Sequence, residues 1–339
     1  MNDLYLHCDA ACTPEPLFTP EQWFPLLGVL PYDVSVFLGT LGLNSAIQDQ
    51  LAGGNDVTVF GYSQSATVST FEMRGITEGI AGIQPDAHQL SFVLIGDPNN
   101  PNGGILERYD LLPQLTLNTG VLGFPPLNLP SAPGFLSFSG ATPVTEYPTD
   151  IYTLEYDPIG DFPRYPIDVL SDVNAILGFP FVHLDYMSLT AAQTANAVEV
   201  PTSAGYDGDT TYYVIPTEDL PLLDPLRSIP VIGPLMSDLV QPDLEVLVNL
   251  GYGDPEYGWV NSDADVPTPF GLFPSSSDLD MVPALLQAGL QQGIQNVMND
   301  LQNPVNLLEN PLVDLAVSPV VWAILTAPIP EVLSLVGLN

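Results

Sequence analysis

The feature that most constrains this chain is a serine placed between a short apolar strand and a helix. Asp56 to Phe60 is a β-branched and aromatic run, typical of a buried strand, and Gly61-Tyr62-Ser63-Gln64-Ser65 follows at once. A helix is expected from there to about Ile83. A strand, a sharp turn with a central serine and then a helix is the setting in which G-x-S-x-G marks a nucleophile.

This setting predicts a nucleophilic role for Ser63. The turn lifts the serine Oγ out of the sheet edge, and small flanking residues let the strand and helix backbones approach each other. Gly61 fits that need, and Ser65 stands where the usual pattern has its last glycine. The backbone N–H of Gln64, at the start of the helix, is the expected donor to an oxyanion.

Further apolar runs extend the same pattern along the chain. Strands are expected at Leu90–Ile95, Ile151–Tyr156 and Thr210–Ile215, and helices at Tyr32–Leu51 and Ile167–Leu177. Helices that alternate with apolar strands predict an α/β fold of the α/β-hydrolase type, with a mainly parallel central sheet flanked by helices.

The last third of the chain has a different character. After residue 215 the sequence to about residue 253 is interrupted by prolines and is expected to form short helical pieces. Pro267–Ser277 resembles a linker, and Leu279–Leu301 is expected to be a helix. We therefore predict a hydrolase domain over residues 1–277 and a C-terminal helical and apolar extension over 278–339.

A serine hydroxyl needs a general base, and the chain has three histidines, His7, His88 and His183. The order in α/β-hydrolases is serine, then acid, then histidine. His7 precedes the first recognisable element, and His88 follows Ser63 too closely to leave room for an acid on a later strand. His183 is therefore the expected base.

The carboxylate that orients this base is expected just after the strand Ile151–Tyr156. Asp157 stands at the strand end and Asp161 lies four residues further on. We favour Asp161, because a loop position lets its carboxylate bend towards the imidazole, and keep Asp157 as the alternative acid that would otherwise cap the turn.

Charge and composition exclude several classes of partner and site. Forty acidic residues against four arginines and no lysine give a formal net charge of −36, which repels nucleic acid.

The apolar tail is broken by prolines and acids, so we expect no integral membrane span. Cys8, Cys12 and His7 lack a fourth ligand, so we expect no metal site there. The sequence indicates no organic cofactor either. The first residues do not have the pattern of a signal peptide.

Several motifs, in order, resemble the PE-PPE domain family of mycobacteria, a group of cutinase-like serine hydrolases. The similarity spans about residues 15–275 and is carried by Phe60–Ala66, Leu94–Gly104, Tyr156–Pro163, Val182–Tyr186, Leu220–Arg227 and Gln241–Leu244. Cutinases have a similar Gly-Tyr-Ser-Gln turn, with a Gly-x-Asp motif before a His-Leu-x-Tyr motif. The resemblance implies Ser63, Asp161 and His183 as nucleophile, orienting acid and base.

The same resemblance implies a function. It points to a serine esterase acting on short to medium acyl esters or lipids in the cell envelope or outside the cell. The alternatives are an acyltransferase in envelope lipid assembly and a non-catalytic surface or partner-binding module that keeps the fold. The family usually opens with a strand and a Gly-Thr-Gly-like turn that supplies a second oxyanion donor. No such turn precedes Tyr32, so we expect the first strand of the family to be missing from this sequence.

Overall fold

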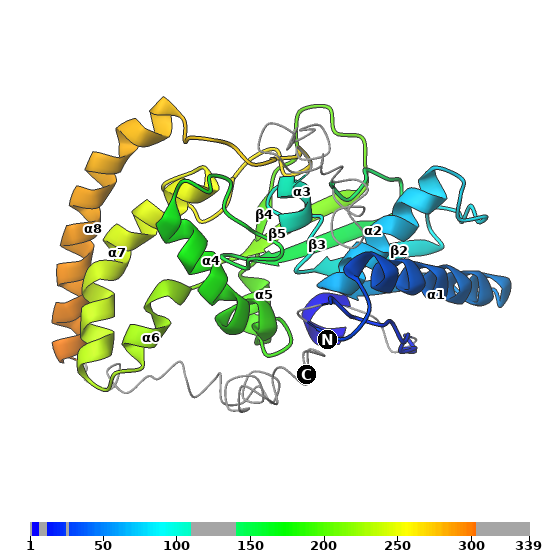
Figure 1. Cartoon of the computed structure of the whole chain (residues 1–339), viewed down its shortest axis with the longest axis horizontal. Coiled ribbons are helices and arrows are strands. Elements are labelled where there is room, and N and C mark those ends of the chain that lie inside the picture. The colour runs from blue at the N-terminus through cyan, green and yellow to red at the C-terminus, as the bar shows by residue number, and fades with distance from the viewer. Residues whose placement is uncertain (1, 7–11, 25–26, 110–139, 303–339) are drawn as a thin grey trace, which may run out of the picture.

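The computed structural model describes residues 2–6, 12–24, 27–109 and 140–302 (Figure 1). Along the chain its elements are η1 (Asn2–Leu6), α1 (Tyr32–Ala52), β1 (Val57–Tyr62), α2 (Gln64–Thr77), β2 (Leu90–Ile95), α3 (Ile105–Arg108), β3 (Thr149–Leu154), α4 (Val169–Phe181), η5 (His183–Asp185), α5 (Ala191–Ala195), β4 (Val198–Val200), β5 (Thr210–Ile215), η6 (Pro221–Leu223), α6 (Asp224–Arg227), α7 (Ile232–Tyr252) and α8 (Ser276–Gln302).

The five described strands form one sheet in the order β1-β2-β3-β5-β4. The first four in this order run parallel, and β4 pairs antiparallel with β5. The register places Tyr62 beside Ile95 and Ile95 beside Tyr152. Because the parallel strands end at one edge, the residues that follow β1, β2 and β3 gather there, which is the usual location of ligand sites in such sheets.

Alternate residues of each strand fill two separate cores, one on each face of the sheet. Val59, Phe92, Leu94 and Ile151 pack with α1 and α2, whereas Val93, Ile95 and Tyr152 pack with η1 and the segment around His183. Helices therefore lie on both faces of the sheet (Figure 1). The mainly parallel, helix-flanked sheet predicted from the sequence is confirmed.

Element boundaries differ from the prediction at three helices. Instead of short pieces, residues 232–252 form the single 21-residue helix α7, which continues through Pro242. Packing against α4 and α8 holds it together despite the lost hydrogen bond. α4 likewise runs through Pro180 to Phe181. α2 stops early, at Thr77, where the N–H groups of Gly79 and Ile80 bond back to Ile76 and Gly75.

The C-terminal helix α8 packs along the length of α7, to which it runs antiparallel (Figure 1). Two glycines allow the close contact. A Cβ on Gly293 would lie 2.0 Å from the carbonyl oxygen of Leu239, and one on Gly289 would lie 2.3 Å from Asp243 Oδ1. Within the described residues, therefore, α8 is joined to α7 by direct backbone contact. The boundary at residue 277 stays a prediction, and residues 303–339 lie outside the described ranges.

We expect Gly293→Ala to lower the free energy of unfolding by about 1–3 kcal/mol, because the new methyl group would meet the backbone of α7. Gly42→Ala in α1 is the matched control. A Cβ there has no neighbour within 4 Å, so the same change should be neutral or stabilising. Chemical denaturation of both variants measures the difference, and equal midpoints would contradict the packing described here.

No helix in the described part of the chain is long and apolar enough to cross a membrane.

Candidate active site

The backbone at Ser63 has the strained geometry that the sequence predicts. Ser63 has φ 56° and ψ −121°, between the last residue of β1 and the first residue of α2. A positive φ is costly for a residue with a side chain and occurs mostly where function needs it. Here it turns the hydroxyl away from the sheet edge, at the carboxyl end of β1.

Small residues on both sides of Ser63 make this turn feasible. A Cβ on Gly61 would lie 2.9 Å from Ala66 Cα, Ser65 O and Ser69 Oγ, so only glycine fits. The Ser65 hydroxyl accepts a hydrogen bond from Tyr62 N (2.9 Å) and donates one to Tyr62 O (2.7 Å). Ser65, at the position of the last glycine in G-x-S-x-G, therefore stabilises the turn through two hydrogen bonds to the backbone of Tyr62.

Ser63, His183 and Asp157 form one hydrogen-bonded chain. The Oγ of Ser63 lies 2.9 Å from His183 Nε2, and His183 Nδ1 lies 2.8 Å from Asp157 Oδ1. His183 is 2% exposed and Asp157 is fully buried, whereas Ser63 is half-buried. The imidazole is therefore shielded except on the side where it meets the hydroxyl, as a base that activates a serine requires.

The choice between the two acids was wrong: Asp157, not Asp161, meets His183. After β3 the chain turns sharply, with Tyr156 at φ 66° and Asp161 N donating to Asp157 O (2.7 Å). This turn carries Asp161 back towards its own strand, where its carboxylate accepts from Tyr156 N (3.3 Å) and faces Arg108. Asp157 also accepts from Ile159 N (2.9 Å), so it caps the turn and contacts the imidazole at once.

The imidazole of His183 is fixed from several sides. The Tyr62 hydroxyl donates to the backbone carbonyl of His183, and the Phe179 ring stacks on the imidazole at 5.4 Å between centroids. Gly96, directly after β2, lies beneath it. A Cβ there would lie 3.0 Å from Asp157 Oδ2 and 3.2 Å from His183 Cε1. Gly96 also has φ 53°, so both space and backbone conformation require glycine.

Gln64 lies where the sequence places it, at the N-terminus of α2. Among the described residues nothing accepts its backbone N–H, which starts the helix beside Ser63. Its side chain points away, accepting from Ser35 Oγ (2.6 Å) and donating to Gln22 O (3.0 Å). The residues before and at the start of α1 thus hold the first turn of α2, and the N–H remains open for a negatively charged oxygen.

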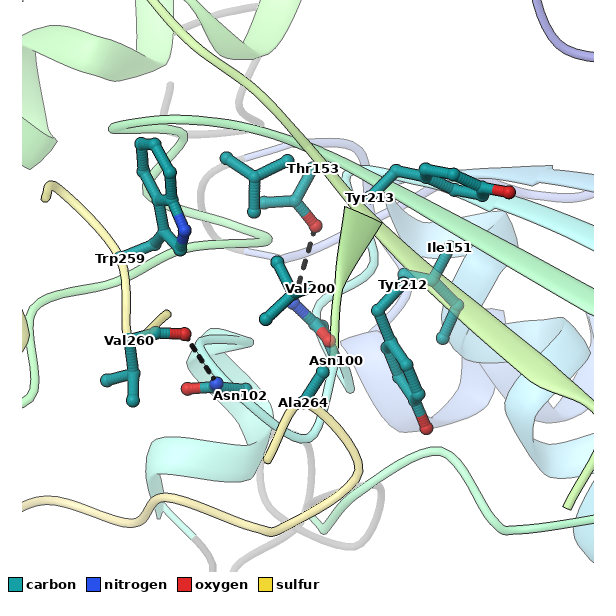
Figure 2. A pocket seen from close by; sticks show the side chains of 11 residues that line it. Asn100, Asn102, Ile151, Thr153, Val200, Tyr212, Tyr213, Trp259, Val260 and Ala264 are labelled. Carbon is teal, nitrogen blue, oxygen red and sulfur yellow. Dashed lines mark hydrogen bonds between the residues drawn. The ribbon is translucent and has the colours of Figure 1, made fainter. Parts of the chain in front are cut away.

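Two hollows lie away from these side chains. Figure 2 shows a cavity of about 20 Å³ between β3, β5 and the segment around Trp259, where Asn100 bonds to Thr153 and Asn102 to Val260. It has room for about one water molecule, too little for an acyl chain. An open groove of about 630 Å³, with Tyr147 and Asp207 among its lining residues, lies near the amino ends of the strands, opposite Ser63.

The described residues include no group of three or more histidine, cysteine, aspartate or glutamate side chains that could hold a metal ion. His7 and Cys8 lie outside the described ranges.

Several carboxyl groups in the described part of the chain are buried and have raised pKa values. Burial raises the pKa of Asp97 to about 6 and the pKa of Glu155 and of Asp224 to about 7. Burial also raises the pKa of Asp161 well above its usual value, and Arg108 offsets this only in part. The folded protein therefore keeps protons on groups that release them in the unfolded chain.

This has a testable consequence for stability. Between about pH 4 and pH 7 the folded state binds more protons than the unfolded state, so the free energy of unfolding falls as the pH rises through this window. Self-repulsion of the −36 charge acts in the same direction. We expect the Tm to be several degrees higher at pH 5.5 than at pH 8, measured by calorimetry at constant ionic strength. A higher Tm at pH 8 would contradict this.

Sequence reasoning missed two contacts of the site. It attached no role to Tyr186, whose hydroxyl lies 2.7 Å from Asp157 Oδ2, or to Gly96 below the imidazole. Each had a signal in the sequence. Gly96 follows a buried strand directly, at the edge where Ser63 lies, and Tyr186 stands three residues after His183, on the same short turn.

Comparison with known proteins decides the family. The model of the PE-PPE domain matches residues 10–253, which is most of the chain. The chain belongs to the PE-PPE domain family. This confirms the resemblance seen in the sequence, and the matched range includes β1 to β5 together with Ser63, Asp157 and His183.

The curated relatives are mycobacterial proteins. The chain is 47% identical over 298 residues to the uncharacterized PPE family protein PPE28 of Mycobacterium tuberculosis, covering 87% of this chain and 42% of that protein. It is 46% identical over 298 residues to Esterase PE16 of the same organism, covering 85% and 52%. It thus spans about half the length of the curated relatives it matches.

A more distant relative is Diacyltrehalose acyltransferase Chp2 of Mycobacterium tuberculosis. The identity is 26% over 219 residues, which is 61% of this chain and 55% of that protein. No solved structure matches this chain. The relatives therefore include one named esterase and one named acyltransferase, and support ester chemistry in general.

Proposed function

We propose that this PE-PPE domain is a serine ester hydrolase that forms an acyl-enzyme on Ser63. The observation that carries the proposal is the pair of contacts at His183, 2.9 Å to Ser63 Oγ and 2.8 Å to Asp157 Oδ1. A base within hydrogen-bonding reach of a hydroxyl, and itself oriented by a carboxylate, is the arrangement that activates serine.

The proposed cycle follows from these positions. Nε2 of His183 takes the Ser63 proton as Oγ bonds to the ester carbonyl carbon, and the negative charge on the carbonyl oxygen faces Gln64 N–H. The carbonyl re-forms, the C–O bond to the alcohol breaks, and His183 returns the proton to the departing alcohol. Water then attacks the acyl carbon and gives a proton to His183 Nε2. The bond from the acyl carbon to Ser63 Oγ breaks and His183 returns that proton to Oγ, which releases the acid and restores Ser63.

The nature of the substrate is supported by charge and by the relatives. A net charge of −36 disfavours anionic head groups, so we propose neutral acyl esters or lipids as substrates. The short to medium chain length that we propose for the acyl group is what the resemblance to the family implies. The name of Esterase PE16 is consistent with this chemistry. Membership of a mycobacterial family supports the further proposal that the protein acts in the cell envelope or outside the cell.

Acyl transfer is the second candidate, favoured by the similarity to Diacyltrehalose acyltransferase Chp2. The same acyl-enzyme would then be resolved by an acceptor alcohol in place of water. Adding an alcohol to a reaction with a labelled ester separates the two. If the new ester forms faster than the free acid, the result would favour the transferase. If only the free acid forms, it would favour the hydrolase.

The proposal is tested by hydrolysis of a series of p-nitrophenyl esters of increasing chain length. We expect the protein to hydrolyse them and Ser63→Ala to lose the activity with its fold intact. Ser262→Ala, at an exposed serine, is the matched control and should retain full activity. A folded protein that hydrolyses none of these esters, or a Ser63→Ala variant as active as the wild type, would contradict it.

A further inference from the structure

The carboxylate of Asp157 is held at both of its oxygens. Oδ1 faces His183 Nδ1 (2.8 Å) and accepts from Ile159 N (2.9 Å). Oδ2 accepts from the hydroxyl of Tyr186 (2.7 Å). A carboxylate can swing about its Cβ–Cγ bond, which has broad torsional freedom, so the contact at Oδ2 acts together with the Ile159 N–H to set which way Oδ1 points.

The direction of the hydrogen bond from Tyr186 follows from its neighbours. The Tyr186 hydroxyl accepts from the backbone N–H of Leu154 (2.8 Å), which can only donate. The hydroxyl's own proton is therefore left for Asp157 Oδ2. Burial and the Asp157 charge raise the pKa of Tyr186 well above its usual value, so the hydroxyl stays protonated and remains a donor.

The Tyr186 ring is itself immobilised. The residue is fully buried, and its ring packs against Tyr62 at 5.6 Å and His183 at 6.2 Å between centroids. Its backbone carbonyl accepts from the Tyr5 hydroxyl (2.8 Å), which ties the η5 turn to η1. Since Leu154 is the last residue of β3, the hydroxyl connects the sheet, the acid and the His183 turn at one point.

We propose that Tyr186 is a positioning residue of the active site, whose hydroxyl fixes the Asp157 carboxylate in the orientation that aligns His183 with Ser63. This rests on the proposed function and adds a group that acts through Asp157 without touching the substrate. Charge-assisted hydrogen bonds of this kind are the stronger ones in proteins, and a buried one holds its partner most firmly.

The test is the variant Tyr186→Phe, which keeps the ring and removes the hydroxyl. With a p-nitrophenyl ester we expect kcat to fall about ten-fold to a hundred-fold, the range spanned by loss of one hydrogen bond to a charged group, and KM to change little. Tyr147→Phe is the matched control. Its buried hydroxyl bonds to Pro85 O far from the site, so kcat should stay at the wild-type value.

A double-mutant cycle with Asp157→Asn separates positioning from plain stability. If Tyr186 acts through Asp157, Tyr186→Phe should change kcat less than about two-fold once Asp157 is replaced. If Tyr186→Phe lowered kcat by the same factor with and without Asp157→Asn, the proposal would be overturned. An unchanged kcat in a folded Tyr186→Phe variant would overturn it too.

Site-specific replacement of Tyr186 by 3-fluorotyrosine provides a second variant that retains the hydroxyl. We expect its kcat to stay within a few-fold of the wild type, and a folded variant as slow as Tyr186→Phe would overturn the proposal. A wild-type protein that hydrolyses no ester would instead contradict the proposed function. An active wild type with a normal Tyr186→Phe would contradict only the role of Tyr186.

Discussion

Replacing His183 by glutamine is expected to lower kcat for ester hydrolysis by about four to six orders of magnitude. Glutamine can still donate a hydrogen bond, but it has no nitrogen that can take the Ser63 proton at neutral pH. The 2.9 Å contact between Nε2 and Oγ would therefore lose its chemical role. Initial rates with a p-nitrophenyl ester, together with the Tm of each protein, measure this.

His88→Gln is the control for this change. His88 is exposed and lies in the loop before β2, so we expect kcat to remain within two-fold of the wild type. A His183→Gln variant that folds and retains a tenth or more of the activity would show that another group acts as the base.

The pair Asp157→Asn and Asp161→Asn should separate the two acids by several orders of magnitude. Asp157→Asn is expected to lower kcat by about 10⁴-fold, because an amide no longer holds the imidazole in the tautomer that leaves Nε2 free to accept a proton. Asp161→Asn should change kcat less than ten-fold, because this buried carboxyl faces Tyr156 N and Arg108 instead of His183. Steady-state kinetics on the two purified variants provide the comparison.

The two substitutions are matched in chemistry, burial and loop, which makes the comparison sharp. The opposite ranking, with Asp161→Asn the more damaging in a folded protein, would support the acid that the sequence favoured and would contradict the role of Asp157.

Much of the fold followed from local patterns in the sequence. The strand before Ser63 and the strand Leu90–Ile95 are short apolar runs bounded by turn residues, and both lie within a residue or two of their expected places. α7 was not foreseen, because prolines normally interrupt a helix. Packing against α4 and α8 outweighs that local preference, and such packing is invisible in a single sequence.

The candidate site could also be predicted only where it depends on local patterns and on chain order. Ser63 and His183 were singled out by a motif and by chain order, which depend on short segments and topology. The choice of acid depended on the path of five residues, 157–161, where a positive φ at Tyr156 and a tight turn reverse the chain. Backbone detail of this kind is not encoded in any simple pattern of residue types. The Tyr186 contact was missed because its partner was misjudged.

The most direct test of the central claim is to locate the covalent adduct that a fluorophosphonate probe forms with the wild-type protein. Such probes phosphonylate a serine that is activated by a neighbouring base, so tandem mass spectrometry of the labelled peptides should find the adduct on Ser63, and Ser63→Ala should not be labelled. A folded wild-type protein that takes up no probe, or one labelled at a different serine, would contradict the account.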